Sequence, residues 1–151
     1  MKIRKAAAGD LSRIAEIFVF NNRINYYPIF RQESFSFGEL QVVSLIDNYF
    51  SKEEVLGNLF VAEDNGIVKG FMEIRQTELG KLYVDPCFQS CGIGEILIEY
   101  AKQNFRISFL WALEKNTKAR KFYNRHGFFE NGEAELEEGT SEYRLKLIRK
   151  E

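Results

Sequence analysis

The sequence is poor in cysteine and histidine, the side chains that most often bind structural metals. It has two cysteines and one histidine among 151 residues. A structural zinc ion normally takes four such ligands, so this scarcity argues against a metal site. We therefore interpret Cys87 and Cys91 as reduced thiols rather than as metal ligands or catalytic nucleophiles, and we expect a protein that needs no metal.

Long apolar runs and an excess of positive charge are also missing. No stretch approaches the roughly 20 apolar residues of a transmembrane helix. The opening MKIRKAAAGD has basic residues with no apolar segment behind them, so it does not resemble a secretory signal. The formal net charge of −1 favours neither nucleic acid nor an anionic membrane as a partner. The sequence thus predicts a soluble, cytoplasmic protein that binds neither nucleic acid nor membranes.

The sequence does contain a large share of apolar and aromatic residues. Hydrophobic residues make up 45% of the chain, and there are 14 Phe and 7 Tyr. This content argues against disorder and for a packed interior or an aromatic-lined pocket. The length is that of one ordinary domain, so we expect a single domain over residues 1–151.

The most informative stretch is Leu79–Lys102, which reads as a strand, a tight loop and a helix. Residues 79–84 are the strand, and the loop Gln89–Gly94 leads into the helix. Apolar residues recur there at helical spacing and predict one buried face: Ile93, Ile96, Leu97, Tyr100 and Ala101. Because the helix opens directly after two glycines, its free backbone N–H groups and its positive dipole end predict an anion site, with phosphate as the expected guest.

The first third of the chain has both clear and irregular patterns. Residues 3–7 read as a short strand, and residues 11–21 read as a helix that ends at Asn21-Asn22. Residues 23–38 hold five aromatic residues without a clean period, so we expect an irregular segment that forms a pocket wall or covers the core. Residues 39–50 read as a second helix.

The middle of the chain predicts a sheet. Residues 59–63 and 67–75 flank Asp64-Asn65-Gly66, which is a strong hairpin signal, and we expect them to form three antiparallel strands with residues 79–84. Residues 108–114 are an apolar strand after the central helix. A strand–helix–strand crossover of this kind predicts that residues 108–114 lie parallel to residues 79–84.

The C-terminal part reads as a helix followed by a hairpin. Asn116-Thr117 starts a helix over residues 118–125, and residues 128–133 and 142–148 form a terminal hairpin. The fold class we expect is therefore mixed α/β, with a central, mostly antiparallel sheet that contains one parallel strand pair and is flanked by helices.

Two local motifs, taken with this order of elements, resemble the GNAT superfamily of acyl-CoA-dependent N-acetyltransferases. The first is Leu82–Pro86 followed by Gln89–Gly94, which is similar to the strand and the Gln/Arg-x-x-Gly-x-Gly/Ala pyrophosphate loop of that family. The second resembles the N-x-x-A-x-x-F-Y-x-x-x-G-F signature and consists of Asn116, Ala119, Phe122, Tyr123, Gly127 and Phe128. The resemblance covers essentially the whole chain, is weakest between Arg23 and Asn58, and implies a GNAT-like sheet whose parallel strand pair is splayed.

The resemblance implies acetyl-CoA as co-substrate. Backbone N–H groups of the loop would hold the pyrophosphate of CoA, and the preceding strand would hold the pantetheine arm, with the Val84 N–H as oxyanion donor. The residues implied for cofactor binding are Leu82, Tyr83, Val84, Gln89, Ser90, Cys91, Gly92, Ile93, Gly94, Asn116 and Phe122. Tyr123 is implied as the general acid that protonates the departing thiolate. The structural alternatives are that Asn116 is an N-cap and Tyr123 an aromatic residue on a buried helix face.

Four charged or titratable residues near the second motif invite functional roles. Lys118, Lys121 and Arg125 share a helix face and could approach the adenosine end of CoA, although a solvated face is the simpler interpretation. His126 invites a role as general base. Its place past the helix end favours a surface or capping position instead.

The general base is where the sequence departs from the family pattern. Many family members carry Glu at the position that Gly80 occupies here. Glu78 would share a strand face with Gly80, and Glu73 lies on the neighbouring strand, so either could act directly or through water. An exposed alkylamine has a pKa of about 10, so a proton route is needed at neutral pH. We predict Glu73 as the base.

The acceptor is expected to be a primary amine of a small molecule or of a protein. By resemblance, residues 26–37 and the terminal hairpin would border its site. Acidic residues without any base lie between Phe128 and Tyr143: Glu130, Glu133, Glu135, Glu137, Glu138 and Glu142. They could attract a cationic amine such as a polyamine, a lysine side chain or a peptide N-terminus, or they could only solubilise an exposed hairpin.

A different function is also compatible with the sequence, namely that of a non-catalytic acyl-CoA-binding or sensing protein of the same fold. Gly80 favours this alternative, because it removes the expected carboxylate. The intact Asn116 and Tyr123 argue against it, because binding alone would not require an acid. The sequence allows a homodimer without fixing the oligomeric state.

Overall fold

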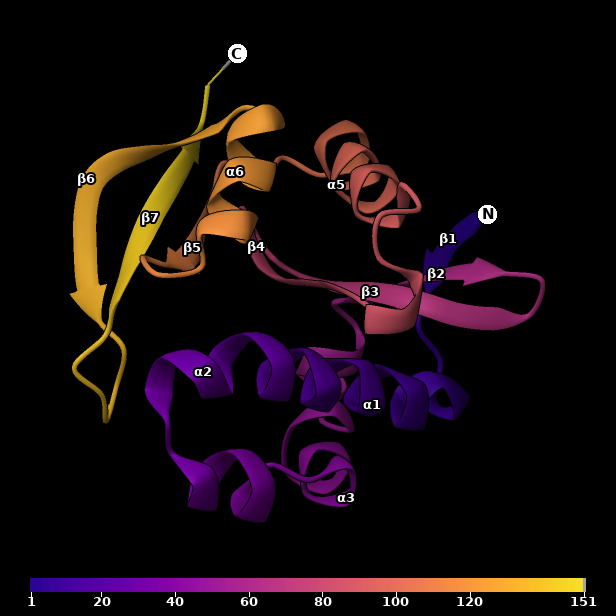
Figure 1. Ribbon diagram of the computed structural model, residues 1–151. Helices are drawn as coiled ribbons and strands as arrows, with labels where there is room; N and C mark the ends of the chain where they lie inside the picture. The colour runs from indigo at the N-terminus through magenta and orange to yellow at the C-terminus, as the bar shows by residue number, and fades with distance from the viewer. Residues whose placement is uncertain (151) are drawn as a thin grey trace.

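The computed structural model describes residues 1–150 and contains a seven-stranded sheet with the strand order β1-β2-β3-β4-β5-β7-β6 (Figure 1). Neighbouring strands are antiparallel except β4 and β5, which are parallel. The strands are β1 (Lys2–Lys5), β2 (Leu59–Asp64), β3 (Ile67–Arg75), β4 (Glu78–Val84), β5 (Phe109–Leu113), β6 (Phe128–Leu136) and β7 (Tyr143–Arg149). The expected mixed α/β fold with one parallel pair is confirmed.

Helices cover both faces of the sheet (Figure 1). They are α1 (Leu11–Asn21), α2 (Tyr27–Phe30), α3 (Val42–Leu45), α4 (Glu53–Leu56), α5 (Ile93–Asn104) and α6 (Thr117–Arg125), with the short turns η1 (Ala8–Asp10), η2 (Asn22–Tyr26), η3 (Ser34–Glu39), η4 (Ile46–Phe50) and η5 (Pro86–Phe88). Residues such as Leu97 and Leu110 form one apolar cluster beneath α5 and α6. Residues such as Ile14 and Phe71 form the other beneath α1. Within residues 1–150, no helix is both long and apolar enough to cross a membrane.

Residues 23–38 are largely helical, so the prediction of an irregular segment there is wrong. The helix predicted to end at Asn21-Asn22 instead runs from α1 into the π-helical turn η2 and then into α2. The side-chain amides of Asn21 and Asn22 donate to the carbonyl oxygens of Ile17 and Phe18, both at 2.9 Å, which keeps these residues inside the helix. The π-helical turns also remove the 3.6-residue period that identifies a helix in a sequence.

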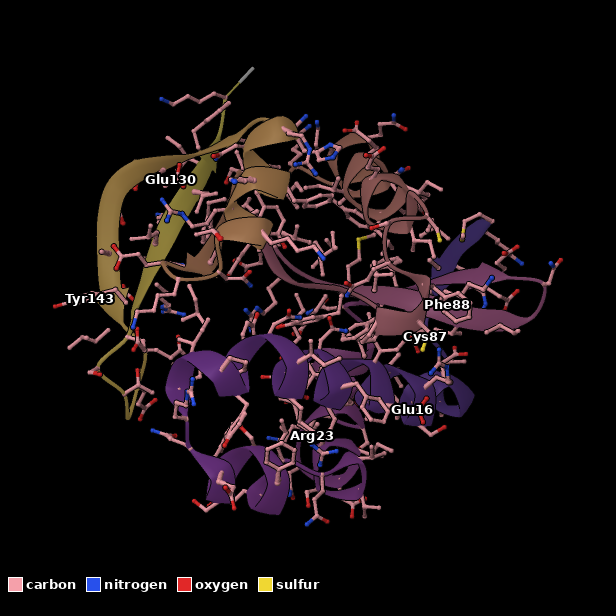
Figure 2. All side chains as sticks on the ribbon, in the orientation of Figure 1. Glu16, Arg23, Cys87, Phe88, Glu130 and Tyr143 are labelled. Atoms are coloured by element: carbon pink, nitrogen blue, oxygen red, sulfur yellow. The ribbon has the colours of Figure 1, made fainter. Side chains whose placement is uncertain are left out.

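Arg23 holds the two parts of this helical segment together (Figure 2). Its guanidinium donates to the carbonyl oxygen of Ser36 at 3.0 Å and to that of Leu40 at 3.2 Å. Between these parts the chain reverses at Arg31, which ends α2 with a left-handed φ of 55°. The segment from residue 21 to residue 40 is therefore a compact helical wall rather than a loose loop.

The predicted hairpin between β2 and β3 is confirmed, because both central turn residues have positive φ values. Asn65 has φ 51° and Gly66 has φ 80°, as a turn of type I′ requires. The predicted helix α5 is also confirmed, but its buried face contains Ile98 in place of the predicted Ile96. Ile98 is fully buried, whereas Ile96 is 42% exposed.

The strands β4 and β5 diverge along their length. They share one register pair, Glu78 with Phe109, whereas β4 remains paired with β3 as far as Val84. The Asp85 N–H donates to the carbonyl oxygen of Lys69 at 2.8 Å. Because amides alternate in direction along an antiparallel strand, the Val84 N–H points away from β3 and into the space that the divergence opens.

A β-bulge explains why β4 carries a glycine where a carboxylate was expected. Glu73 pairs with Lys81, and the register of β3 and β4 then shifts between Glu73 and Ile74, which leaves Gly80 without a partner directly opposite. A Cβ atom at Gly80 would lie 2.6 Å from Nε of Arg75. The Arg75 side chain therefore fills the place that a side chain at Gly80 would take.

Candidate active site

A cavity of about 890 Å³ lies where β4 and β5 diverge. It extends from the loop Gln89–Gly94, past β4 and α6, to the helical wall at residues 21–40 and the β6–β7 hairpin. Figure 1 shows α1 and α2 on one side of this region and α6, β5 and β7 on the other. Most of the residues predicted from the sequence line it, namely Leu82, Tyr83, Val84, Gln89, Ser90, Gly92, Ile93, Gly94, Asn116, Phe122 and Tyr123.

One end of the cavity has the geometry of an anion site. Gly92 adopts φ 84°, which lets the chain turn sharply into α5. The first hydrogen bond of the helix runs from the Ile96 N–H to the carbonyl oxygen of Gly92 at 3.1 Å. The amides of Ile93, Gly94 and Glu95 come before that bond and remain available to an anion at the positive end of the helix dipole.

Asn21 anchors this loop to β4, a role that the sequence interpretation missed. Its Nδ2 donates to the carbonyl oxygen of Val84 at 2.9 Å, and its Oδ1 accepts from Nε2 of Gln89 at 3.2 Å. Gln89 also donates to the Val84 carbonyl, at 3.3 Å. Asn21 is only 3% exposed. A burial of this kind cannot be read from the sequence, where Asn21-Asn22 looks like an ordinary helix end.

Three cationic side chains of α6 stand at the same end. Lys118, Lys121 and Arg125 all line the cavity, and Nζ of Lys118 donates to Oε1 of Gln89 at 3.3 Å. All three residues are exposed, so their position is compatible both with a solvated face and with an approach to a bound anion. Together with the free amides, these side chains give the loop end of the cavity a positive potential.

The second motif brings a cap and an aromatic ring to the cavity wall. Oδ1 of Asn116 accepts from the Ala119 N–H at 3.3 Å, so the predicted N-cap forms while the residue also lines the cavity. A Cβ atom at Gly94 would lie 3.3 Å from the ring of Phe122. A larger residue at position 94 would therefore crowd Phe122 and narrow the entrance beside the loop.

Three tyrosines meet in the middle of the cavity. The hydroxyls of Tyr26 and Tyr83 lie 3.1 Å apart, and Tyr123 also lines this part of the wall. Burial is the main cause that raises the pKa of each of the three, and the negative charge of Glu137 adds to the effect on Tyr26 and Tyr83. All three hydroxyls are consequently protonated at neutral pH and can donate a proton or a hydrogen bond.

Glu73 is buried away from the cavity surface. The residue is only 1% exposed. Its carboxylate accepts hydrogen bonds from the Tyr49 hydroxyl at 2.6 and 2.8 Å and from Nζ of Lys81 at 3.1 Å. Lys81 lines the cavity, and burial lowers its pKa. Glu78, the other expected carboxylate, accepts from Arg75 at 3.3 Å. Contact between Glu73 and a molecule in the cavity therefore runs through Lys81.

The remaining candidates lie outside the cavity. His126 is the C-cap residue of α6, as predicted, and its Nδ1 lies 3.1 Å from Oε1 of Glu99. Cys87 and Cys91 are free and exposed, and Cys91 does not line the cavity although the loop around it does. In residues 1–150, no group of three His, Cys, Asp or Glu side chains is arranged to hold a metal ion.

The far end of the cavity is aromatic and carries two acids. Its wall includes Phe18, Tyr26, Phe30, Phe35, Leu40 and Trp111. Glu137 and Glu138, from the turn between β6 and β7, complete it. Nε2 of Gln32 donates to the carbonyl oxygen of Gly139 at 3.4 Å, so the helical wall and the hairpin meet there. Figure 2 shows Tyr143 beside this turn and Glu130 further along β6.

Residues 56–130 match the family model of the acetyltransferase (GNAT) domain. A stretch of 76 residues is 30% identical to the peptidyl-lysine N-acetyltransferase YjaB of Escherichia coli, over 50% of this chain and 52% of that protein. Another stretch of 76 residues is 40% identical to the uncharacterized N-acetyltransferase MJ1207 of Methanocaldococcus jannaschii, over 47% of this chain and 34% of that protein. The chain thus matches about half the length of YjaB and about a third of the length of MJ1207.

Two solved structures share the whole fold. The apo form of YjaB from Escherichia coli aligns with a TM-score of 0.74 at 24% identity and covers 98% of this chain and 96% of its own. The PaiA N-acetyltransferase of Thermoplasma acidophilum, solved in complex with coenzyme A, aligns with a TM-score of 0.68 at 22% identity over 96% of both chains. These TM-scores show that the fold is shared.

Proposed function

Because the chain belongs to the GNAT superfamily of acyl-CoA-dependent N-acetyltransferases, we propose that it transfers the acetyl group of acetyl-CoA directly to a primary amine. One observation carries this proposal. The anion-binding end of α5, the outward-facing N–H of Val84 and the hydroxyl of Tyr123 belong to one continuous cavity. These are the parts that a thioester needs for binding, activation and release.

Acetyl-CoA would lie with its pyrophosphate on the amides at the start of α5, flanked by Lys118 and Lys121. A crystal structure of a protein with this fold in complex with coenzyme A supports the choice of ligand. The pantetheine arm would follow the diverging edge of β4 and pass Asn116, which has no hydrogen-bond acceptor for its Nδ2 among residues 1–150. Phe122 would pack beside the loop.

The reaction needs one bond made and one broken. The acceptor nitrogen attacks the thioester carbonyl carbon, and the Val84 N–H stabilises the oxyanion. When the C–S bond breaks, the Tyr123 hydroxyl gives its proton to the departing sulfur of CoA, and the tyrosinate is reprotonated by the extra proton on the nitrogen of the new amide. No hydrogen bond from this hydroxyl to another side chain is found in the described part of the chain, so it is free to donate in this step.

The acceptor ammonium must also lose a proton before it attacks. In this proposal the proton passes to the neutral form of Lys81, and Glu73 and Tyr49 hold the resulting ammonium. In this proposal Lys81, and not the predicted Glu73, is the base, and Glu73 stabilises the protonated form of Lys81. The lowered pKa of Lys81 favours the neutral form that this step requires.

The decisive test is thiol release from acetyl-CoA in the presence of a panel of amines, with Tyr123→Phe as the diagnostic variant. We expect kcat to fall by roughly 100-fold or more, with an unchanged Kd for CoA. Tyr100→Phe, a change on α5 outside the cavity, is the matched control and should behave like the wild type. Unchanged kcat in Tyr123→Phe would refute the assignment of the acid.

A second candidate function is a non-catalytic acyl-CoA-binding or sensing protein. The observation that favours it is the buried position of Glu73 together with Arg75 over Gly80, which leaves no carboxylate at the usual place on β4. CoA binding without thiol release on any amine would support this alternative.

The relatives and the cavity support two classes of acceptor. One relative is named as a peptidyl-lysine acetyltransferase, so a protein amino group is one candidate and a small amine is the other.

We also propose a cytoplasmic location, since a reducing compartment keeps exposed thiols such as Cys87 and Cys91 free. Size measurements in solution would decide whether the protein is a monomer or the homodimer that the sequence allows.

A further inference from the structure

The acids of the terminal hairpin fall into two groups. Four of them form ion pairs: Glu130 with Arg120 at 3.0 Å, Glu133 with Lys146 at 3.7 Å, Glu135 with Arg144 at 2.7 Å and Glu142 with Lys115 at 2.9 Å. Glu137 and Glu138 have no ion pair among residues 1–150, and these are the two acids of the hairpin that line the cavity. Solubility alone does not explain why only the cavity-lining acids are left unpaired.

The basic residues at this end of the cavity are already neutralised. Lys81 lies 3.1 Å from Glu73, which balances its charge whenever Lys81 is protonated, and Arg144 is paired with Glu135 at 2.7 Å. Arg144 also lies over the ring of Trp111, at 4.6 Å from its centroid. The unpaired charge at this end is therefore negative, whereas Lys118, Lys121 and Arg125 make the opposite, loop end positive.

The wall between these acids and the tyrosines suits an alkyl chain that carries positive charge. Phe30 and Phe35 line it, and the ring of Tyr26 lies 6.4 Å from that of Phe30. Aromatic faces attract ammonium groups and also pack against methylene groups. The charge of Glu137 reaches the Tyr26 and Tyr83 hydroxyls, because it contributes to their raised pKa values. The acids and the reaction centre thus belong to one electrostatic environment.

The contact between Gln32 and Gly139 restricts the far end of the cavity, where the helical wall meets the hairpin. A slender molecule can lie along the wall with one end at the thioester and the other end at the hairpin. The geometry favours a small acceptor.

We propose that the acceptor is a small linear diamine, with one amine at the thioester carbonyl and the second, protonated amine bound by Glu137 and Glu138. This inference rests on the proposed function. One nitrogen loses a proton, attacks the carbonyl carbon and releases CoA as its thiol. The second nitrogen keeps its charge and is not acetylated in the same event.

The test compares kcat/KM for linear α,ω-diamines of increasing chain length with kcat/KM for the monoamine of each length. We expect the wild type to prefer the diamine. A hydrogen bond to a charged group in a partly enclosed site should raise kcat/KM by about tenfold to hundredfold. Glu137→Gln and the double variant with Glu138→Gln should lose this preference, so that kcat/KM for the diamine falls to that for the monoamine in the same variant. The preference should also shrink as salt is added.

Glu133→Gln is the matched control, since it removes a carboxylate from the same hairpin outside the cavity and should leave the preference intact. Equal kcat/KM values for diamine and monoamine in the wild type would overturn this inference alone. The same conclusion holds if a lysine peptide is a better acceptor than every diamine. Absence of thiol release with any amine, in protein that still binds CoA, would instead overturn the proposed function and this inference with it.

Discussion

Replacing Asn21 with alanine should weaken both the fold and the binding of CoA. The side chain of Asn21 donates to the carbonyl oxygens of Ile17 and Val84, both at 2.9 Å, and accepts from Gln89 at 3.2 Å. In Asn21→Ala the Val84 carbonyl retains the longer bond from Gln89, and Gln89 loses one of its own partners. Each short hydrogen bond contributes about 1 kcal/mol net, so two of them predict a loss of about 2 kcal/mol in the free energy of unfolding.

Asn104 provides the matched control, because its side-chain amide, like that of Asn21, donates to the carbonyl oxygen four residues earlier, that of Tyr100 at 3.0 Å. Its side chain is exposed, so Asn104→Ala should change the free energy of unfolding by about 0.5 kcal/mol or less. Urea unfolding measures both variants. Calorimetric titration with CoA should show a Kd roughly tenfold weaker in Asn21→Ala, a difference of about 1.4 kcal/mol. Equal stability losses in the two variants, or an unchanged Kd, would refute the role of Asn21 as the anchor of the loop.

Three further predictions concern the proton route, the loop and the core. In Lys81→Met no neutral lysine can take the proton of the acceptor ammonium, so the pH at which kcat/KM rises should move up to the pKa of the acceptor amine. If kcat/KM rises at the same pH as in the wild type, Lys81 is not the base. Gly94→Val should weaken CoA binding at least about tenfold in a calorimetric titration, because the added Cβ lies 3.3 Å from Phe122 and its methyl groups enter the cavity; normal affinity would contradict the position given to the pyrophosphate. Leu97→Ala, at a fully buried position, should cost about 2–5 kcal/mol in urea unfolding, and a loss no larger than that of the exposed Ile96→Ala would show that α5 does not pack as described.

The sequence predicts best those elements that are determined by neighbouring residues. The hairpin at Asn65-Gly66 forms because these residues tolerate positive φ, and α5 forms because its apolar residues recur at helical spacing. Both signals lie within a few residues. The motif residues that line the cavity, such as Asn116 and Tyr123, were found through a family resemblance that also depends on local spacing.

The features that escaped prediction depend on contacts between distant segments. The Tyr26 hydroxyl meets Tyr83, which is 57 positions away, and Gln89 meets Asn21, which is 68 positions away. No local pattern records such pairs. The position of Glu73 is a similar case, because the bulge at Gly80 and the partners Tyr49 and Lys81 together determine which surface the carboxylate reaches.

Because β4 and β5 share a single register pair, the sheet consists of two parts that are joined at that pair. One part is made of β1 to β4 and the other of β5, β7 and β6. The described residues have no other register pair between β4 and β5, so from there on the cavity lies between the two parts of the sheet. A ligand that contacts both parts therefore connects them across the cavity. At 100 times its Kd a ligand bound in the cavity adds about 2.7 kcal/mol to the free energy of unfolding, so the thermal stability of this protein should report on whether the cavity is occupied.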